Sequence, residues 1–69
     1  MSDNIKLSIN GEVQARPACS LARLLNELGY EADQVATAVN GEFVARQQRE
    51  DTELSEHDAI EIIAPMAGG

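Results

Sequence analysis

Apolar and polar residues alternate near the start of the chain in a pattern that predicts a β-hairpin. Residues 5–9 place three aliphatic side chains at every second position, the period of a strand with one buried face. Asn10-Gly11 follows, and this dipeptide suits the two positive φ angles of a type I′ turn. Residues 12–16 therefore return as a second strand, and we expect Val13 and Ala15 to lie on its buried face.

A leucine stripe after this hairpin predicts the main helix. The stripe has i, i+3, i+4, i+7 spacing and consists of Leu21, Leu24, Leu25 and Leu28. Ser20 is a suitable N-cap, and Gly29 stands where a left-handed residue would end the helix. So short a helix has negligible stability alone, so we expect the stripe to pack against a sheet.

The middle of the chain predicts a second hairpin. Residues 30–34 are polar and read as a connector or a single helical turn. Residues 35–39 are rich in β-branched side chains, which favours a strand. Asn40-Gly41 repeats the turn chemistry and leads into a fourth strand over 42–45.

The last third of the chain predicts a surface crossing followed by a strand. Residues 46–58 are polar except for Leu54, which we expect to anchor the crossing to the core. A turn is expected at His57-Asp58. Residues 59–63 alternate in polarity with two isoleucines on one face, and they read as a final, central strand.

This order of elements predicts the α+β class and a β-grasp, or ubiquitin-like, fold. A mixed sheet of four to five strands would pack on one main helix, with the first and last strands adjacent and parallel. We expect residues 1–63 to form this domain and residues 64–69 to form a flexible C-terminal tail ending in Gly-Gly.

The net charge of the chain excludes some classes of binding partner. Twelve acidic residues against five lysines and arginines give a formal net charge of −7 and a pI near 4.3. Such a surface repels nucleic-acid backbones and anionic lipid heads, so we expect neither as a partner. The chain has no apolar run of the roughly 18 residues that a membrane span requires. We therefore expect a soluble, cytoplasmic protein.

The titratable side chains do not predict an active site. Cys19 precedes the helix, where the dipole could make it reactive, although an ordinary small side chain is the simpler reading. His57 reads as a solvated turn residue, and Arg46 and Arg49 read as members of surface ion pairs. A chain this small also leaves little room for a concave site of about 300 Å³. We expect a protein that is not an enzyme and binds no metal or cofactor itself.

The C-terminal sequence carries the candidate chemistry. A Gly68-Gly69 end has no Cβ atoms, so it can thread into a narrow channel and present its carboxylate to another protein's active site. Pro65, Met66 and Ala67 would provide an apolar grip without bulk. A carboxylate is a poor electrophile, so its chemistry would begin with adenylation by a partner that uses ATP and Mg²⁺. A sulfur nucleophile would then make a thiocarboxylate at Gly69. The alternative is that the C-terminus has no function of its own.

Several segments together resemble one known family. They are Ile9-Asn10-Gly11-Glu12, the leucine helix ending at Leu28-Gly29, Val39 to Arg46, Asp58 to Ile62, and Ala67-Gly68-Gly69. This combination resembles the ThiS family, the ubiquitin-like sulfur carriers of thiamine biosynthesis, over nearly the whole chain.

The resemblance implies a set of partners. An E1-like, ThiF-like enzyme would adenylate Gly69, a cysteine desulfurase or rhodanese-type protein would supply persulfide sulfur, and a ThiG-like thiazole synthase would receive the thiocarboxylate. Arg46 matches the family's arginine after the fourth strand, and it is a candidate partner contact together with Phe43.

The sequence departs from the family pattern at three positions and leaves two alternatives open. Ala45 stands where the family often has Pro, Arg49 where it often has Trp, and His57 where it usually has Gly. A MoaD-like small subunit, which delivers sulfur to a molybdopterin precursor, would share fold, tail and activation. A β-grasp binding module whose tail is never activated is the alternative from another class.

Overall fold

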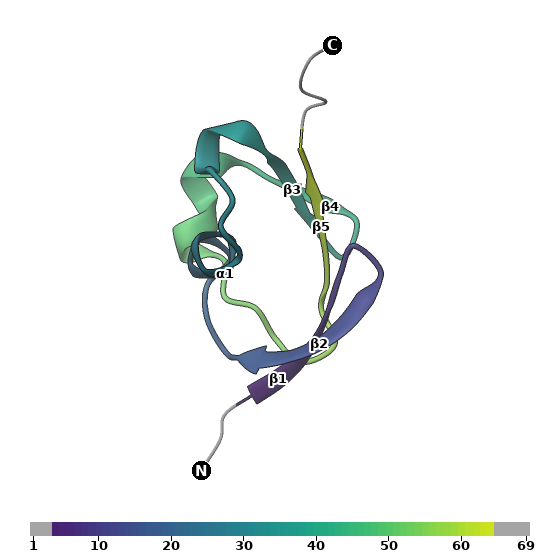
Figure 1. Cartoon of the computed structure of the whole chain (residues 1–69). Coiled ribbons are helices and arrows are strands. Elements are labelled where there is room, and N and C mark those ends of the chain that lie inside the picture. Colours follow the sequence, from purple (N-terminus) through teal and green to yellow (C-terminus); the bar gives the residue numbers. More distant parts are fainter. Residues whose placement is uncertain (1–3, 65–69) are drawn as a thin grey trace.

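Five strands form a mixed sheet that packs on one face against a helix (Figure 1). This computed structural model describes residues 4–64. The elements are β1 (Asn4–Ile9), β2 (Glu12–Pro17), α1 (Leu21–Leu28), the 3₁₀ helix η1 (Ala32–Gln34), β3 (Ala36–Val39), β4 (Glu42–Val44), the 3₁₀ helix η2 (Arg46–Asp51) and β5 (Ala59–Ile63). The predicted residues 65–69 of the tail lie outside the described part of the chain. No helix within residues 4–64 is long and apolar enough to cross a membrane.

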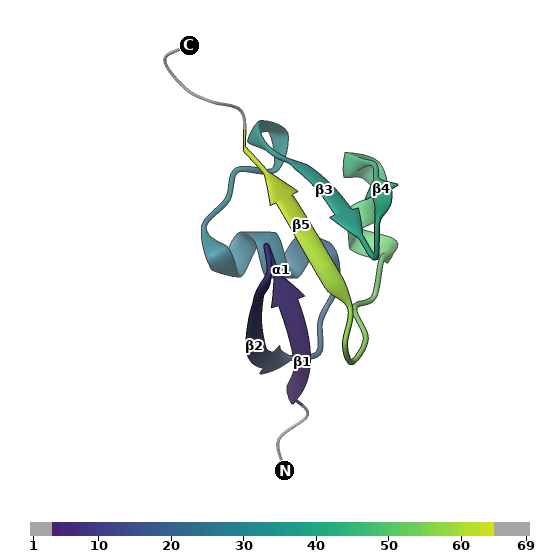
Figure 2. The same cartoon turned by 90° about the vertical axis from the view of Figure 1, so that its right-hand side faces the viewer.

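The strand order is β2-β1-β5-β3-β4, with β5 in the centre of the sheet (Figure 2). β5 pairs in parallel with β1 and antiparallel with β3. The two hairpins β1–β2 and β3–β4 occupy the two sides. The predicted α+β, β-grasp fold and the central last strand are therefore confirmed.

Local chemistry explains the turns and the helix ends. Both Asn-Gly pairs have positive φ at both residues, 52° and 86° at Asn10-Gly11 and 53° and 82° at Asn40-Gly41, as a type I′ turn requires. The Ser20 hydroxyl accepts a 3.2 Å hydrogen bond from the Arg23 amide and so caps α1. Gly29 ends the helix in the left-handed region with φ 88°.

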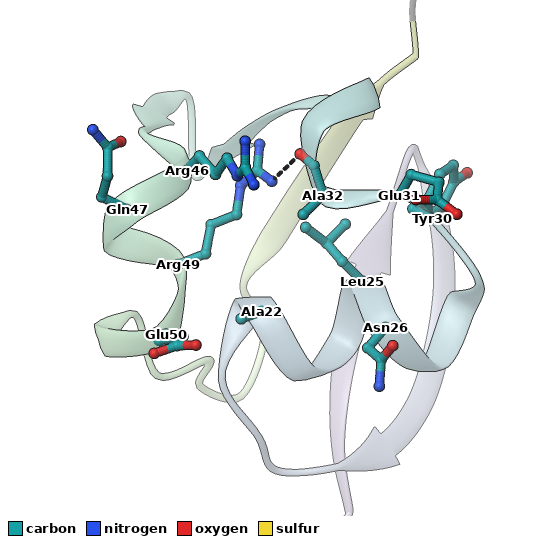
Figure 3. Close-up of a pocket in the computed structure, with 10 residues that line it drawn as sticks. All are labelled: Ala22, Leu25, Asn26, Tyr30, Glu31, Ala32, Arg46, Gln47, Arg49 and Glu50. Atoms are coloured by element: carbon teal, nitrogen blue, oxygen red, sulfur yellow. Dashed lines mark hydrogen bonds between the residues drawn. The ribbon is translucent and has the colours of Figure 1, made fainter.

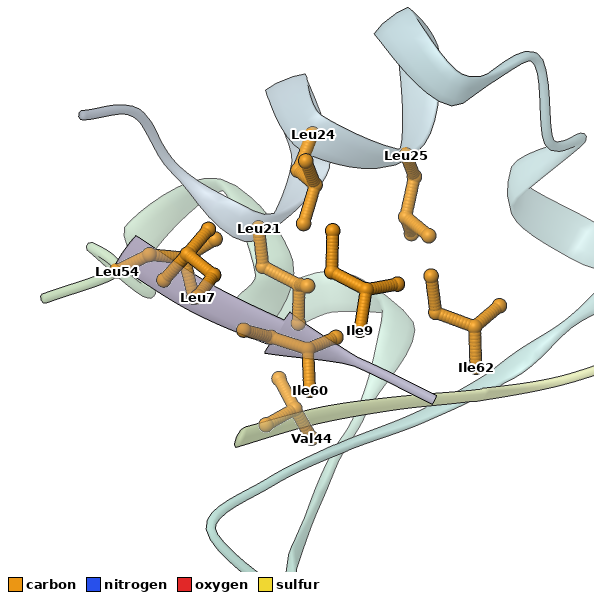
Figure 4. Packing of buried hydrophobic residues seen from close by; sticks show 9 residues of the cluster. All are labelled: Leu7, Ile9, Leu21, Leu24, Leu25, Val44, Leu54, Ile60 and Ile62. Carbon is orange, nitrogen blue, oxygen red and sulfur yellow. The ribbon is translucent and has the colours of Figure 1, made fainter. Parts of the chain in front are cut away.

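Three leucines of the stripe and three isoleucines of the sheet lie in the core (Figure 4). The buried apolar residues are Leu7, Ile9, Leu21, Leu24, Leu25, Val44, Leu54, Ile60 and Ile62. Each fully buried aliphatic side chain contributes about 2 kcal/mol through the hydrophobic effect. Leu54 is among them, which confirms that it anchors the crossing segment to the core.

The predicted buried face of β2 is wrong. Val13 is 70% exposed and Ala15 is exposed as well, whereas Gln14 and Arg16 are half-buried. The two-residue turn sets the register so that Leu7 pairs with Gln14, and paired residues of an antiparallel ladder share a face. The side chains of β2 that face α1 are therefore the polar ones.

Both turn asparagines also hold the central strand through their side chains. Asn10 Nδ2 donates to the Ile62 carbonyl at 3.2 Å, and the Ile62 amide donates to Asn10 Oδ1 at 2.8 Å. Asn40 Oδ1 accepts from the Ala59 amide at 2.9 Å, and its Nδ2 donates to Asp58 Oδ1 at 2.9 Å. The start and the end of β5 are thus held by the two hairpin turns.

The Asn10→Gly variant isolates this contribution. Glycine keeps the turn conformation but removes both hydrogen bonds to Ile62, so we expect a loss of about 1–2 kcal/mol in the free energy of unfolding. Urea unfolding measures the loss, and amide hydrogen exchange should quicken at Ile62. In the matched variant Asn40→Gly the quickened exchange should appear at Ala59 instead. Unchanged exchange at Ile62 in Asn10→Gly would contradict the assignment.

Candidate functional site

The predicted reactive end lies outside the described residues. The tail residues follow Ala64 in the sequence, and the roles predicted for them remain predictions; they are Pro65, Met66, Ala67, Gly68 and Gly69. The structure describes what precedes them: β5 ends at Ile63 in the middle of the sheet, and the exposed Ala64 follows. The tail therefore continues from a strand that has neighbours on both sides.

The structure places Phe43 and Arg46 on different sides of the molecule. Phe43 is 72% exposed, and because the adjacent Val44 is buried in the core, Phe43 lies on the sheet face away from α1. Val13 and Ile63 are exposed on the same face. Arg46 is also exposed but begins η2, and Figure 3 shows its side chain beside that of Arg49 and directed toward η1. The two candidate partner contacts are not neighbours in one site.

An open groove of about 900 Å³ lies between α1, η1 and η2 (Figure 3). We call it the arginine groove; Ala22 and Leu25 of α1, Tyr30, Arg46 and Arg49 contribute to its wall. The expectation that so small a chain leaves little room for a concave site of about 300 Å³ was wrong. The polar crossing segment forms η2 and packs against α1, and this packing creates the groove.

Arg49 is the buried charge of the groove. Its side chain is 4% exposed, and the prediction of a surface ion pair was wrong. The guanidinium donates to the carbonyls of Ala32 and Val35 at 2.8 Å each and to Thr37 Oγ1 at 3.1 Å. The Thr37 hydroxyl donates in turn to the Val44 carbonyl at 3.0 Å. Arg49 therefore ties η2 to η1 and β3.

The electrostatic surroundings of Arg49 are unusual for a buried charge. Burial, and to a smaller degree the neighbouring Arg46, lowers the pKa of the Arg49 guanidinium. Within residues 4–64 neither arginine forms an ion pair with a carboxylate. By contrast, Arg16 and Arg23 both pair with Glu27, at 3.6 and 3.1 Å.

Cys19 and His57 do not join the groove. Burial, followed by the charge of Glu27, raises the pKa of the Cys19 thiol, so the structure favours an ordinary side chain over a reactive one. His57 is an exposed turn residue with φ 71°, a conformation that favours glycine. Within the described part, no three His, Cys, Asp or Glu side chains are grouped to hold a metal ion.

Comparison with known protein sequences identifies relatives of the whole chain. The sequence model of the ThiS family matches residues 7–69. An uncharacterized protein, ycf40, of Porphyra purpurea is 30% identical over 70 residues, which cover 100% of this chain and 99% of the relative.

Solved structures share the fold. The crystal structure of the thiamine biosynthesis protein ThiS from Geobacter metallireducens superposes with a TM-score of 0.80 at 28% identity, covering 94% of this chain and 100% of that one. A solution structure of a thiamine biosynthesis protein from the same organism gives a TM-score of 0.79 at 29% identity, covering 94% of this chain and 88% of that one.

Proposed function

The chain belongs to the ThiS family of ubiquitin-like sulfur carriers, and on this premise we propose that it carries sulfur as a thiocarboxylate on Gly69. The observation that carries the proposal is the family match, which extends through the closing Gly68-Gly69. The β-grasp domain that precedes the tail supports it. The sulfur would serve thiazole formation in thiamine biosynthesis.

The chemistry begins with activation of a poor electrophile. A ThiF-like enzyme uses ATP and Mg²⁺; an oxygen of the Gly69 carboxylate attacks the α-phosphorus and pyrophosphate leaves. The terminal sulfur of a persulfide, from a cysteine desulfurase or rhodanese-type donor, then attacks the acyl carbon and displaces AMP. A thiol cleaves the resulting S–S bond, which leaves the thiocarboxylate and a new disulfide. A ThiG-like thiazole synthase accepts the sulfur.

The β-grasp domain is, in this proposal, the part of the chain that partner enzymes bind. In this proposal Pro65, Met66 and Ala67 enter the partner's channel, and Gly68 allows the close approach. The domain supports this by holding the strand before the tail: Ile62 is paired with the backbone of Thr37 in β3 and the side chain of Asn10. The chain supplies the reacting carboxylate, and its partners supply the catalysts and the cofactors.

A MoaD-like subunit would use the same activation, and only the acceptor of the sulfur would differ. The family match favours thiazole formation. A binding module whose tail is never activated would instead leave Gly69 unmodified in every condition.

Mass spectrometry tests the proposal directly. After incubation with ATP, Mg²⁺, the adenylating enzyme and a persulfide donor, we expect one oxygen of Gly69 to be replaced by sulfur. Oxidation of a methionine changes the mass by nearly the same amount, so fragmentation must place the change on the last residue. Omission of ATP is the control. Failure to find the exchange at Gly69 with all components present would rule out the sulfur-carrier proposal.

A further inference from the structure

Neither Arg46 nor Arg49 of the arginine groove forms an ion pair with a carboxylate within the described part of the chain, although Glu31 and Glu50 also contribute to the groove wall. Figure 3 shows the guanidinium groups of Arg46 and Arg49 next to each other at the wall of the groove. The chain as a whole carries a net charge of −7, so this pair is a local exception to an acidic surface. Bringing two like charges together is unfavourable unless an anion compensates them.

The Arg49 guanidinium is held in a fixed position from which it can donate hydrogen bonds to an anion. The three guanidinium nitrogens donate to neutral oxygens, which hold the group in place without forming an ion pair. A guanidinium has five N–H groups, so two remain after these three hydrogen bonds. Arg46 is exposed and unpaired within residues 4–64, so its side chain can close on an anion that Arg49 orients.

The rest of the groove selects the kind of anion. Glu31 and Glu50 also contribute to its wall, and together with the acidic surface they oppose a doubly charged phosphate more than a singly charged carboxylate. The half-buried Ala22 and the exposed Tyr30 offer apolar surface that suits a hydrocarbon arm. An aspartate or glutamate side chain has this combination.

We propose that the arginine groove binds the carboxylate of an acidic side chain on the partner enzyme that receives the tail. The proposal rests on the proposed function for the identity of that partner alone. The negative charge of the whole chain attracts it to a basic surface of the partner but does not fix how the chain is oriented there. A single contact between opposite charges on the α1 side of the chain would fix that orientation.

A titration with small anions tests the groove without any partner. Nuclear magnetic resonance signals of the Ala22 and Tyr30 amides and of the Arg49 Nε–H group should shift saturably with acetate at constant ionic strength. We expect Arg46→Gln to weaken acetate binding by about fivefold or more. Arg23→Gln, which removes an exposed arginine outside the groove, should bind acetate like the natural chain. Absence of saturation, equal binding by Arg46→Gln, or tighter binding of inorganic phosphate than of acetate would overturn the proposal.

A second arm measures affinity for the adenylating enzyme. We expect Arg46→Glu to bind at least about tenfold more weakly than the natural chain, and Arg23→Glu to bind as the natural chain does. If the natural chain binds and Arg46→Glu binds equally well, the inference fails while the proposed function stands. If the natural chain neither binds nor supports pyrophosphate exchange, the proposed function fails, and with it the identity of the partner.

Discussion

Replacing Gly68 by valine should abolish ATP–pyrophosphate exchange by the adenylating enzyme. A β-branched side chain restricts φ and widens the segment that threads a narrow channel in the proposed mechanism, so we expect the carboxylate no longer to reach ATP. Misplacing a reacting group by about 1 Å costs roughly a hundredfold in rate, and we expect at least that loss. The measurement is exchange of radiolabelled pyrophosphate into ATP with the variant as substrate.

Two controls separate threading from folding. Ala64→Val introduces the same side chain at an exposed position before the proposed threading segment, and it should keep exchange near the natural rate. Deletion of Gly69 should abolish exchange as completely as Gly68→Val. Circular dichroism should show all three variants folded. Normal exchange by Gly68→Val, or exchange that survives the deletion of Gly69, would contradict the role of the tail.

Replacing the buried Arg49 by leucine should cost about 3 kcal/mol in the free energy of unfolding. The substitution removes the donors for the carbonyls of Ala32 and Val35 and leaves both under-satisfied beneath the groove. A domain of this size has a total stability of roughly 3–5 kcal/mol, so only about 0–2 kcal/mol should remain and up to about half of the variant should be unfolded at room temperature. Urea unfolding followed by circular dichroism measures the change.

A conservative variant keeps this prediction testable if leucine unfolds the chain. Arg49→Lys retains the charge but cannot reproduce the three-way donor arrangement, so its loss should fall between those of the natural chain and Arg49→Leu. Arg23→Leu removes an exposed arginine whose ion pair with Glu27 is worth less than about 1 kcal/mol. A loss in Arg49→Leu no larger than that in Arg23→Leu would show that Arg49 is not a structural tie.

Local sequence patterns predicted the turns and the ends of the helix because residues close together in the sequence determine these features. The positive φ of Asn10-Gly11, the cap at Ser20 and the left-handed Gly29 depend on a few adjacent atoms, and all three were correctly predicted. The inward face of β2 was predicted wrongly, although the turn length alone sets that register. Counting back from the two-residue turn would have placed Gln14 opposite Leu7.

The candidate groove could not be predicted because its contacts are distant in sequence. Arg49 reaches acceptors 12 to 17 positions earlier in the chain, at Thr37, Val35 and Ala32. Its immediate neighbours are those of a solvated loop, so nothing local separates a buried arginine from an exposed one. The hydrogen bonds of Asn10 to Ile62 span 52 positions and were hidden behind an ordinary turn signal.

The sequence by itself determined the elements, their order and the diglycine end that carries the proposed chemistry, since propensity, capping and turn geometry act over a few residues. The tertiary structure alone decided which charges became buried and where a groove opened. Those outcomes depend on packing between segments far apart in the chain, where an arginine is buried because carbonyls from elsewhere meet its donors.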